Sequence, residues 1–192
     1  LVILTALWVA ATALVVIPRY PELLAERVKP KKGTKTWDIA ILGIYGVVSL
    51  VRYVVAGLAV RFGWMLEIFV PVQIISFIIA ALGYGLVVWA TGTNAYFSQT
   101  VRIQRERGHR VVMEGPYRFV RHPAYTGIIL FELASAVMLA SWWVVLLSTV
   151  SIVLFIVRTA LEDKTLIAEL SGYADYAQRT RYRLLPGVWK QL

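Results

Sequence analysis

The 192-residue sequence contains no cysteine and only two histidines, His109 and His122. The absence of cysteine excludes disulfides, thiolate metal sites and cysteine nucleophiles. Two histidines are too few for a histidine-rich metal site, so we expect no bound metal. Charged residues make up only 16% of the chain, which is less than an ordinary soluble domain carries.

Apolar residues take the place of the missing charge. Hydrophobic residues make up 59% of the chain and its mean hydropathy is +0.68, values typical of a protein that lies in a lipid bilayer. Several apolar stretches approach the roughly 20 residues that a helix needs to cross the hydrocarbon core. They cover residues 1–17, 38–60, 67–90, 124–140 and 142–157. We therefore predict an all-α integral membrane protein with five transmembrane helices and a single domain over residues 1–192.

Two of these spans need a separate argument. Residues 1–17 are interpreted as a span and not as a signal peptide, because no basic leader or small-residue cleavage site accompanies them. The 34 residues from Ala124 to Val157 would form a helix about 51 Å long, well beyond the roughly 30 Å hydrocarbon core. We therefore expect a hairpin of two short helices that turns near Ser141-Trp142-Trp143.

Other residues predict where helices begin and end. Asp38 is a candidate N-cap for the second span, because aspartate side chains accept hydrogen bonds from free backbone N–H groups. Beyond the fifth span, Leu161, Leu166 and Leu170 recur near helical spacing with charged residues between them. This pattern predicts a separate tail helix over about residues 159–180 that lies along the membrane surface.

Basic residues are distributed unevenly along the chain, which has 20 Lys and Arg against 11 Asp and Glu. They concentrate in three segments, which contain Arg19, Arg27, Lys29, Lys31, Lys32 and Lys35; Arg102, Arg105, Arg107, Arg110, Arg118 and Arg121; and Arg158, Lys164, Arg179, Arg181, Arg183 and Lys190. Five spans place all three segments on one side, which the positive-inside rule identifies as cytosolic. Membrane topology thus accounts for the basic charge, and we expect no nucleic-acid partner.

Two polar motifs stand at the cytosolic ends of the predicted hairpin. In the first, Pro123 fits the opening turn of a helix whose N-terminus can hold an anionic group, and His122 shares a face with Tyr125. In the second, Arg158 and Glu162 are four residues apart on one helix face. Because the hairpin returns to the boundary that it left, we expect the two motifs to lie together. Taken singly, Arg158 and Glu162 could be a surface ion pair, and His122 a headgroup anchor.

Arg52 and Glu132 are ionisable residues inside predicted spans. Such residues are rare in membranes and mark either functional sites or internal pairs. Counted along the helices, Arg52 lies about 21 Å and Glu132 about 14 Å from the cytosolic boundary, a difference that a long arginine side chain can partly bridge. We favour a structural pairing of the two residues over the lining of a substrate channel.

Three groups of motifs follow one another over about residues 94–190. They are Gly-Pro-Tyr and Arg-His-Pro-X-Tyr-X-Gly within 115–127, Arg158-X-X-X-Glu162-Asp163, and Tyr173-X-X-Tyr176 followed by Arg181 and Leu185-Pro186-Gly187. In this series the chain resembles the isoprenylcysteine carboxyl methyltransferases and their relatives among the phospholipid methyltransferases. The short five-span form resembles prokaryotic members, which implies the plasma membrane and an active site that faces the cytosol.

The resemblance implies S-adenosylmethionine as cofactor, with S-adenosylhomocysteine as product, and a prenylated cysteine or another lipidic acceptor as substrate. It assigns the cofactor to His109, Arg110, Val111, Val112, Tyr117, His122, Pro123, Ala124, Tyr125 and Glu162. It assigns the substrate carboxylate to Arg158, so that Arg158 and Glu162 are the catalytic pair. An amide that the family places upstream falls on Arg102, with Gln104 nearby, and the sequence leaves open which of them contacts the cofactor.

The residues fit methyl transfer to a carboxylate. A C-terminal carboxyl has a pKa of about 3.3–3.7, so the acceptor is already a nucleophile at neutral pH and needs no general base. Arg158 can hold a carboxylate through two hydrogen bonds. A phospholipid amine is the alternative acceptor and would need a base, for which His122 or Glu162 would serve. Less favoured alternatives are a sterol-reductase-like enzyme with a nicotinamide cofactor and a non-catalytic lipid-binding protein.

Overall fold

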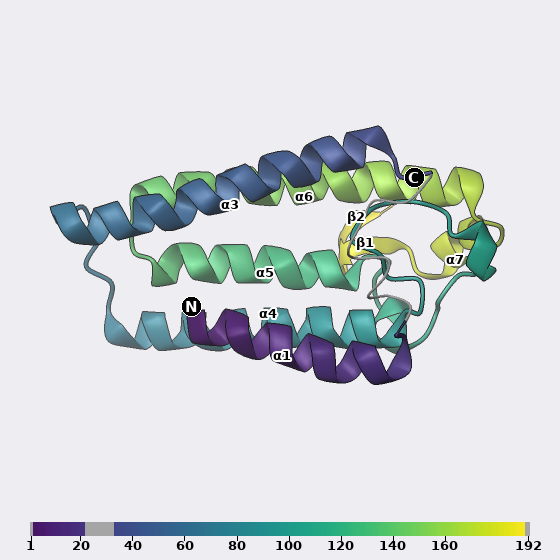
Figure 1. Cartoon of the computed structure of the whole chain (residues 1–192), viewed down its shortest axis with the longest axis horizontal. Coiled ribbons are helices and arrows are strands. Elements are labelled where there is room, and N and C mark those ends of the chain that lie inside the picture. The colour runs from purple at the N-terminus through teal and green to yellow at the C-terminus, as the bar shows by residue number, and fades with distance from the viewer. Residues whose placement is uncertain (1, 22–32, 191–192) are drawn as a thin grey trace.

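The computed structural model describes residues 2–21 and 33–190 of the chain. Most of the described residues belong to helices, which are α1 (Val2–Arg19), α3 (Thr36–Phe62), α4 (Val70–Thr93), the 3₁₀ helices η1 (Arg105–Arg107) and η2 (Gly115–Arg118), α5 (Pro123–Met138), α6 (Trp142–Glu169) and α7 (Tyr173–Arg179). A two-stranded hairpin of β1 (Tyr182–Leu185) and β2 (Val188–Lys190) follows α7. Figure 1 shows the long helices side by side, with α5 between the α3–α6 pair and the α1–α4 pair.

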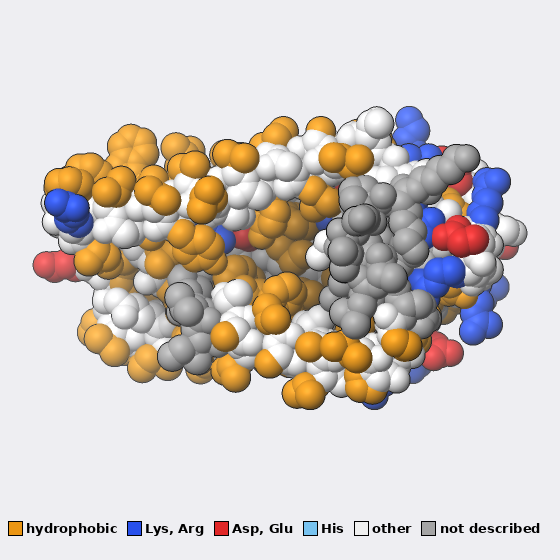
Figure 2. All heavy atoms as spheres, viewed as in Figure 1, with side chains coloured by type: hydrophobic (Ala, Val, Ile, Leu, Met, Phe, Trp, Pro, Cys, Tyr) orange, Lys and Arg blue, Asp and Glu red, His pale blue; other side chains and the backbone are white. Residues whose placement is uncertain are grey.

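Three helices, α3, α4 and α6, are long and apolar enough to cross a membrane by length and composition. The described apolar parts of α1 and α5, Thr5–Arg19 and Pro123–Met138, are shorter. Large apolar side chains face outward, and Leu50, Leu82 and Phe69 are 67%, 66% and 75% exposed. Hydrophobic side chains cover most of the face in Figure 2. An aqueous protein rarely presents such a surface, so this is a multi-pass membrane protein.

The turn predicted between the last two spans is present. α5 ends at Met138 and α6 begins at Trp142, and Ala140 adopts a left-handed conformation with φ of 47°. The carbonyl of Ala140 accepts a hydrogen bond of 2.6 Å from the backbone N–H of Leu66, which ties this turn to the turn between α3 and α4. α5 is short, at 16 residues, as expected.

α6 is not short, and here the sequence prediction was wrong. The helix runs without a break through the predicted end at Val157 to Glu169 and contains 28 residues. The predicted tail helix over 159–180 is therefore divided between α6 and the short α7, with Gly172 at φ of 79° between them. The physical reason is that neither proline nor glycine interrupts residues 158–171, so the helix continues until a glycine reverses the chain.

The C-terminal segment contains a β-hairpin that an all-α prediction does not include. β1 and β2 pair antiparallel, with Tyr182 opposite Lys190 and Leu185 opposite Val188. Gly187 lies in the turn at φ of 86°, a conformation that glycine adopts without strain. The Pro186-Gly187 dipeptide is a turn signal, and it would have predicted this hairpin.

Two glycines let α4 and α5 approach closely. A Cβ atom at Gly83 would lie 2.6 Å from the carbonyl oxygen of Gly127, so no side chain fits between the two backbones. Gly127 is the last residue of the Arg-His-Pro-X-Tyr-X-Gly motif. A glycine is needed there because a side chain would clash with the backbone of α4. This contact fixes the depth of α5, and with it the position of His122 and Tyr125.

The loops between helices lie at two ends of the bundle. Residues 94–122, α7 and the hairpin gather at one end, and the α3–α4 and α5–α6 turns lie at the other (Figure 1). Charged side chains gather at the first end in Figure 2, and Arg61 lies at the opposite end of α3. This agrees with the predicted grouping of basic residues for those that are described. Arg27, Lys29, Lys31 and Lys32 lie outside the described residues.

Arg52 and Glu132 form a buried ion pair that joins α3 to α5, as the sequence predicted. The Tyr45 hydroxyl donates a second hydrogen bond of 3.2 Å to the Glu132 carboxylate. Arg52 Nη1 also lies 3.5 Å from Ser135 Oγ and 3.4 Å from Ser148 Oγ. These contacts lower the cost of burying the ion pair, and Arg52 Nε is left buried without a hydrogen-bond partner among the described residues.

Candidate functional site

A pocket opens at the loop end of the bundle. Its walls come from the loop 94–122, which follows α4, from the start of α5, from the last turns of α6 and from α7. It contains about 770 Å³ of space that no atom fills, part of it open to solvent.

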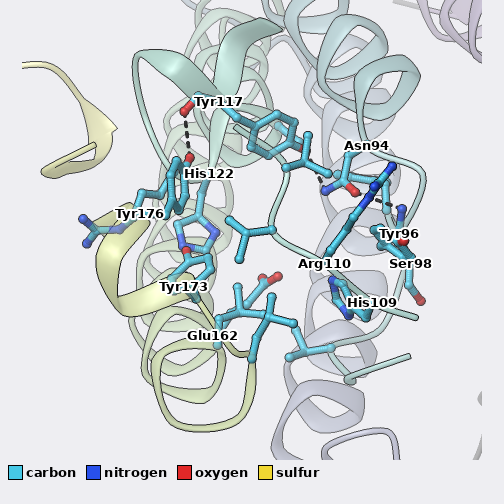
Figure 3. Close-up of a pocket in the computed structure, with 18 of the residues that line it drawn as sticks. Asn94, Tyr96, Ser98, His109, Arg110, Tyr117, His122, Glu162, Tyr173 and Tyr176 are labelled. Atoms are coloured by element: carbon cyan, nitrogen blue, oxygen red, sulfur yellow. Dashed lines mark hydrogen bonds between the residues drawn. The ribbon is translucent and has the colours of Figure 1, made fainter. Parts of the chain in front are cut away.

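All ten residues that the family resemblance assigned to a cofactor line this one pocket. They are His109, Arg110, Val111, Val112, Tyr117, His122, Pro123, Ala124, Tyr125 and Glu162. Figure 3 shows several of these side chains facing a common space from the loop, from α5 and from α6. The pocket therefore brings together residues that come from three separate motifs.

Asn94 and Tyr96 organise one wall of the pocket. Asn94 Oδ1 accepts a hydrogen bond of 2.9 Å from the backbone N–H of Tyr96, and Asn94 Nδ2 donates one of 3.3 Å to the Tyr117 hydroxyl. The Tyr96 ring stacks on His109, with centroids 4.6 Å apart (Figure 3). Asn94 was not among the residues that the sequence predicted for the site. The sequence signal that could have indicated it is an amide residue at the end of an apolar helix, two positions before an aromatic residue.

His109 offers this wall a neutral ring. Burial, together with the nearby positive charges of Arg102 and Arg107, lowers the pKa of His109 to about 4 from the usual 6.5. Its Nδ1 faces the backbone N–H of Gln104 at 3.2 Å and accepts that hydrogen bond. At neutral pH His109 therefore presents an aromatic face and carries no charge.

The two candidates for the upstream amide contact have different positions. Arg102 lines the pocket, and its guanidinium pairs with Glu106 at 2.6 Å. Gln104 is fully buried, donates to the Tyr96 carbonyl at 2.7 Å and accepts from Arg107 at 2.5 Å. The Gln104 amide therefore holds the loop together, and the amide that lines the pocket belongs to Asn94.

Tyr125 is the residue through which the two predicted motifs meet. Its hydroxyl donates a hydrogen bond to the Glu162 carboxylate, and its ring stacks on His122 with centroids 5.6 Å apart. The guanidinium carbon of Arg158 lies 5.0 Å from the centre of the same ring. His122 and Tyr125 thus share a helix face as expected, and the hairpin places both motifs at one level.

Arg158 lies beside the pocket and is paired with a residue of α3. It is not among the residues that line the pocket, and it pairs with Asp38 and not with Glu162. Its Nε and Nη2 atoms donate to the two Asp38 carboxylate oxygens at 2.7 Å and 3.3 Å. The prediction that Asp38 caps α3 was wrong, because Lys35 holds that position and the Asp38 side chain turns to Arg158.

Asp163 is the most highly coordinated carboxylate near the site, and the sequence argument gave it no role. It is fully buried and accepts hydrogen bonds from Arg121 Nε at 2.8 Å, Arg183 Nε at 2.9 Å and the Tyr173 hydroxyl at 3.1 Å. His122 Nε2 lies 3.3 Å from it. Asp163 thus joins α6 to the start of α5, to α7 and to β1.

Arg121 attaches the C-terminal segment to this centre. Its Nη1 donates to the carbonyls of Thr180 and Arg181 at 2.9 Å and 3.0 Å. The backbone N–H groups of Arg121 and His122 donate to the carbonyls of Tyr182 and Arg183. The β-hairpin therefore docks directly on the Arg-His-Pro motif and holds His122 in place.

Two tyrosines of α7 complete the pocket wall. The Tyr176 hydroxyl donates to the Tyr117 carbonyl at 2.7 Å, and the Tyr173 hydroxyl donates to Asp163. Burial raises the pKa of both phenols, so they stay protonated and act as donors. Figure 3 shows the two rings beside His122.

The charges of the pocket suit a ligand that carries groups of both signs. Among the described residues of its lining, Glu162 is the one carboxylate, and Arg102, Arg110 and Arg121 supply positive charge. Arg121 and Arg102 already pair with Asp163 and Glu106. Arg110 and Glu162 are therefore the groups best placed to bind the charges of a ligand.

Comparison with known proteins identifies the family. The sequence profile of the isoprenylcysteine carboxyl methyltransferase family matches residues 72–168, which run from the first turn of α4 to the last turn of α6. The chain is similar to protein-S-isoprenylcysteine O-methyltransferase B of Arabidopsis thaliana, with 29% identity over 85 residues. It is also similar to a probable protein-S-isoprenylcysteine O-methyltransferase of Oryza sativa subsp. indica, with 30% identity over 89 residues.

These two alignments cover 43% of this chain, and 43% and 44% of the respective relatives. The chain thus matches less than half of the length of these curated relatives. The family profile itself extends over half of the chain and includes α5, the loop before it and the Arg158–Glu162 motif. The protein therefore belongs to the isoprenylcysteine carboxyl methyltransferase family.

Proposed function

We propose that this protein transfers the methyl group of S-adenosylmethionine to the C-terminal carboxylate of a prenylated cysteine. The observation that carries the proposal is the meeting of ten expected cofactor residues in one pocket, with Arg158 against its wall residue Tyr125. The family to which the chain belongs, and the methyltransferases to which it is similar, support the same activity.

The charges and rings of the pocket fit an S-adenosyl ligand. S-adenosylmethionine would supply an electrophilic methyl group, whose bond to sulfur breaks as the acceptor oxygen attacks. Glu162 would bind the amino group and Arg110 the carboxylate, since each offers the opposite charge in the wall. The stacked rings of Tyr96 and His109 offer a flat apolar face for a base. The aromatic rings around Tyr125 favour a sulfonium cation.

The acceptor needs a carboxylate partner and an apolar environment. Arg158 carries a permanent positive charge, which would bind and orient the acceptor carboxylate. Tyr125 also belongs to an apolar cluster with Phe155 and Leu184, which Tyr45 and Trp189 extend. We propose that this cluster receives the first part of the prenyl chain. Binding of the acceptor in this way would exclude water from the carboxylate.

A phospholipid amine is less well supported as the acceptor. An ammonium group must lose a proton before it attacks, and the two candidate bases were His122 and Glu162. His122 Nε2 faces Asp163 at 3.3 Å, and Glu162 already accepts the Tyr125 hydroxyl. In the proposed arrangement Glu162 binds the amino group of the methyl donor, which leaves His122 Nδ1 as the candidate base for an amine, whereas a carboxylate acceptor needs no base.

A methyl-transfer assay tests the proposal. Detergent-solubilised protein would be given labelled S-adenosylmethionine with either N-acetyl-S-farnesylcysteine or phosphatidylethanolamine. We expect methyl ester formation on the prenylcysteine and micromolar binding of S-adenosylhomocysteine in calorimetry, a common range for enzyme ligands. Folded protein that binds no S-adenosylhomocysteine would contradict methyl transfer altogether. Transfer to phosphatidylethanolamine alone would support the phospholipid alternative.

We further propose five membrane crossings with the pocket in the cytosol of a prokaryotic cell. The basic residues at the pocket end support this orientation, and the exposed Trp142 and Trp143 support a membrane boundary at the other end. The chain has no cysteine, so single-cysteine variants can report exposure. In intact cells, an impermeant maleimide should label Trp143→Cys and leave Lys164→Cys unlabelled. The reverse pattern would invert the proposed topology.

A further inference from the structure

Asp38 and Arg158 form an ion pair across 120 residues of sequence. Asp38 lies in the first turn of α3 and is fully buried. Besides its two bonds from Arg158, its Oδ2 atom accepts the backbone N–H of Val101 at 2.7 Å. The Asp38 carboxylate is therefore held by three donors, and it cannot turn without losing several of them.

The way in which Arg158 is held limits how it can bind anything else. A guanidinium is a rigid planar fork, and Asp38 occupies the edge that Nε and Nη2 form. Nη2 also donates to the carbonyl of Gln99 at 2.6 Å. Within the described part of the chain, the hydrogen bonds of Arg158 come from these two nitrogens. Nη1 is the atom left for an incoming carboxylate.

We propose that Asp38 is a positioning residue of the acceptor site. This inference rests on the proposed function, because it concerns how Arg158 meets the acceptor carboxylate. By holding one edge of the guanidinium, Asp38 directs Nη1 and fixes the plane of the group against the Tyr125 ring, 5.0 Å away. Arg158 then binds the acceptor through Nη1 while it stays attached to Asp38.

The opposite interpretation is that Asp38 occupies the place of the acceptor and has to leave. Burial argues against this, because departure of Arg158 would strand a fully buried carboxylate with one backbone N–H as its partner. The two interpretations predict changes of opposite sign. A positioning residue helps the acceptor to bind, whereas a competing carboxylate hinders it.

Asp38 also touches the wall of the pocket. Val101 lines the pocket, and Gln99 precedes it in the same loop. A change at Asp38 could therefore act on the methyl donor as well as on the acceptor. The test has to measure binding of S-adenosylhomocysteine separately from the KM of the acceptor.

Asp38→Asn is the variant that tests the proposal, because it removes the charge and keeps the size of the side chain. Glu169→Gln is the matched control, since the Lys35–Glu169 pair, 2.6 Å long, also connects the start of α3 to α6 but is solvent-exposed. For Asp38→Asn we expect the KM for N-acetyl-S-farnesylcysteine to rise by about tenfold or more, the scale of one charge-assisted hydrogen bond. Affinity for S-adenosylhomocysteine should change far less, and Glu169→Gln should match the wild type.

An unchanged KM for the acceptor in folded Asp38→Asn would overturn the positioning role, and a lowered KM would favour the competing interpretation. If Asp38→Asn does not fold, Asp38→Glu supplies the test, because it keeps the charge. Its longer side chain displaces the carboxylate, so its KM for the acceptor should lie above that of the wild type. If Asp38→Glu has the same KM for the acceptor as the wild type, the carboxylate at this position does not orient Arg158.

A spectroscopic measurement separates this inference from the proposed function. In protein labelled with ¹⁵N-arginine, the Nε–H signal of Arg158, assigned by its loss in Arg158→Lys, should exchange slowly in the wild type and in Glu169→Gln. It should exchange rapidly in Asp38→Asn, and added N-acetyl-S-farnesylcysteine should shift it in the wild type. A shift without any methyl transfer would sink the proposed function and leave the positioning role standing. Fast exchange in the wild type would overturn the positioning role alone.

Discussion

The phenolic hydroxyl of Tyr125 donates a hydrogen bond to the carboxylate of Glu162, 37 residues further along the chain. This bond joins the Arg-His-Pro motif at the start of α5 to the pocket end of α6. It also leaves the remaining lone pairs of the Glu162 carboxylate available to a ligand. The relationship predicts that the two residues contribute unequally to binding of the methyl donor.

Glu162→Gln should weaken S-adenosylhomocysteine binding by about tenfold or more, because a bond to a charged group contributes about 1.5–3 kcal/mol. Tyr125→Phe removes a hydroxyl that orients Glu162, and it should weaken binding by less. Calorimetry on the solubilised variants measures both effects. Glu169→Gln, on an exposed turn of the same helix, is the control and should bind like the wild type. Equal losses in Glu162→Gln and in this control would remove Glu162 from the site.

Arg158→Lys should fold and bind S-adenosylhomocysteine but lose most methylation of a prenylcysteine. Lysine keeps the positive charge for Asp38 and lacks the planar fork that serves two carboxylates at once. Arg158→Ala should abolish methylation as well, and it should also lower the free energy of unfolding by about 3–5 kcal/mol, because it leaves Asp38 buried without its partner. Activity that survives in either variant would mean that Arg158 does not hold the acceptor.

Asp163→Asn should destabilise the pocket end of the bundle. It breaks a buried pair with Arg121 and also weakens contacts to Arg183 and Tyr173. We expect the free energy of unfolding to fall by about 3–5 kcal/mol, and thermal denaturation in detergent measures the loss. Asp175→Asn, on the exposed side of α7, removes the same charge and should have little effect. The prediction fails if the two variants melt alike.

The depressed pKa of His109, about 4 against the usual 6.5, makes stability depend on pH. Between these values the unfolded chain binds the proton more readily than the folded one, so stability rises with pH and is complete above about 6.5. Lowering the pH through this window should therefore reduce the melting temperature. His109→Gln cannot be protonated there and should show a smaller decrease. Identical pH dependence in both proteins would mean that His109 is not buried as described.

Gly83→Ala should destabilise the bundle, and Gly85→Ala on the same helix should not. The added methyl at position 83 meets the Gly127 carbonyl oxygen at 2.6 Å, whereas nothing lies within 4 Å of one at position 85. Overpacking of this kind costs about 1–3 kcal/mol. Melting temperatures of the two variants provide the comparison. A stable Gly83→Ala would show that α4 and α5 can separate without cost.

Much of the site was within reach of sequence reasoning because motif residues are close together in the chain. The stacking of His122 on Tyr125 follows from helical spacing, and their meeting with Glu162 follows from the length of the hairpin. The ten pocket residues came from a family resemblance and not from spacing. Asn94 and Asp163 were missed because the residues around them in the sequence do not indicate which side chains they contact in the fold.

The sequence by itself determined the membrane residence, the apolar helices, the turn before Trp142 and the concentration of basic charge between them. These properties depend on hydropathy and spacing within one segment, so they need no knowledge of neighbours. Only the tertiary structure decided that Arg158 pairs with Asp38 and that Asp163 binds Arg121. Such pairs depend on the depth and rotation of separate helices, which contacts such as Gly83 against Gly127 fix.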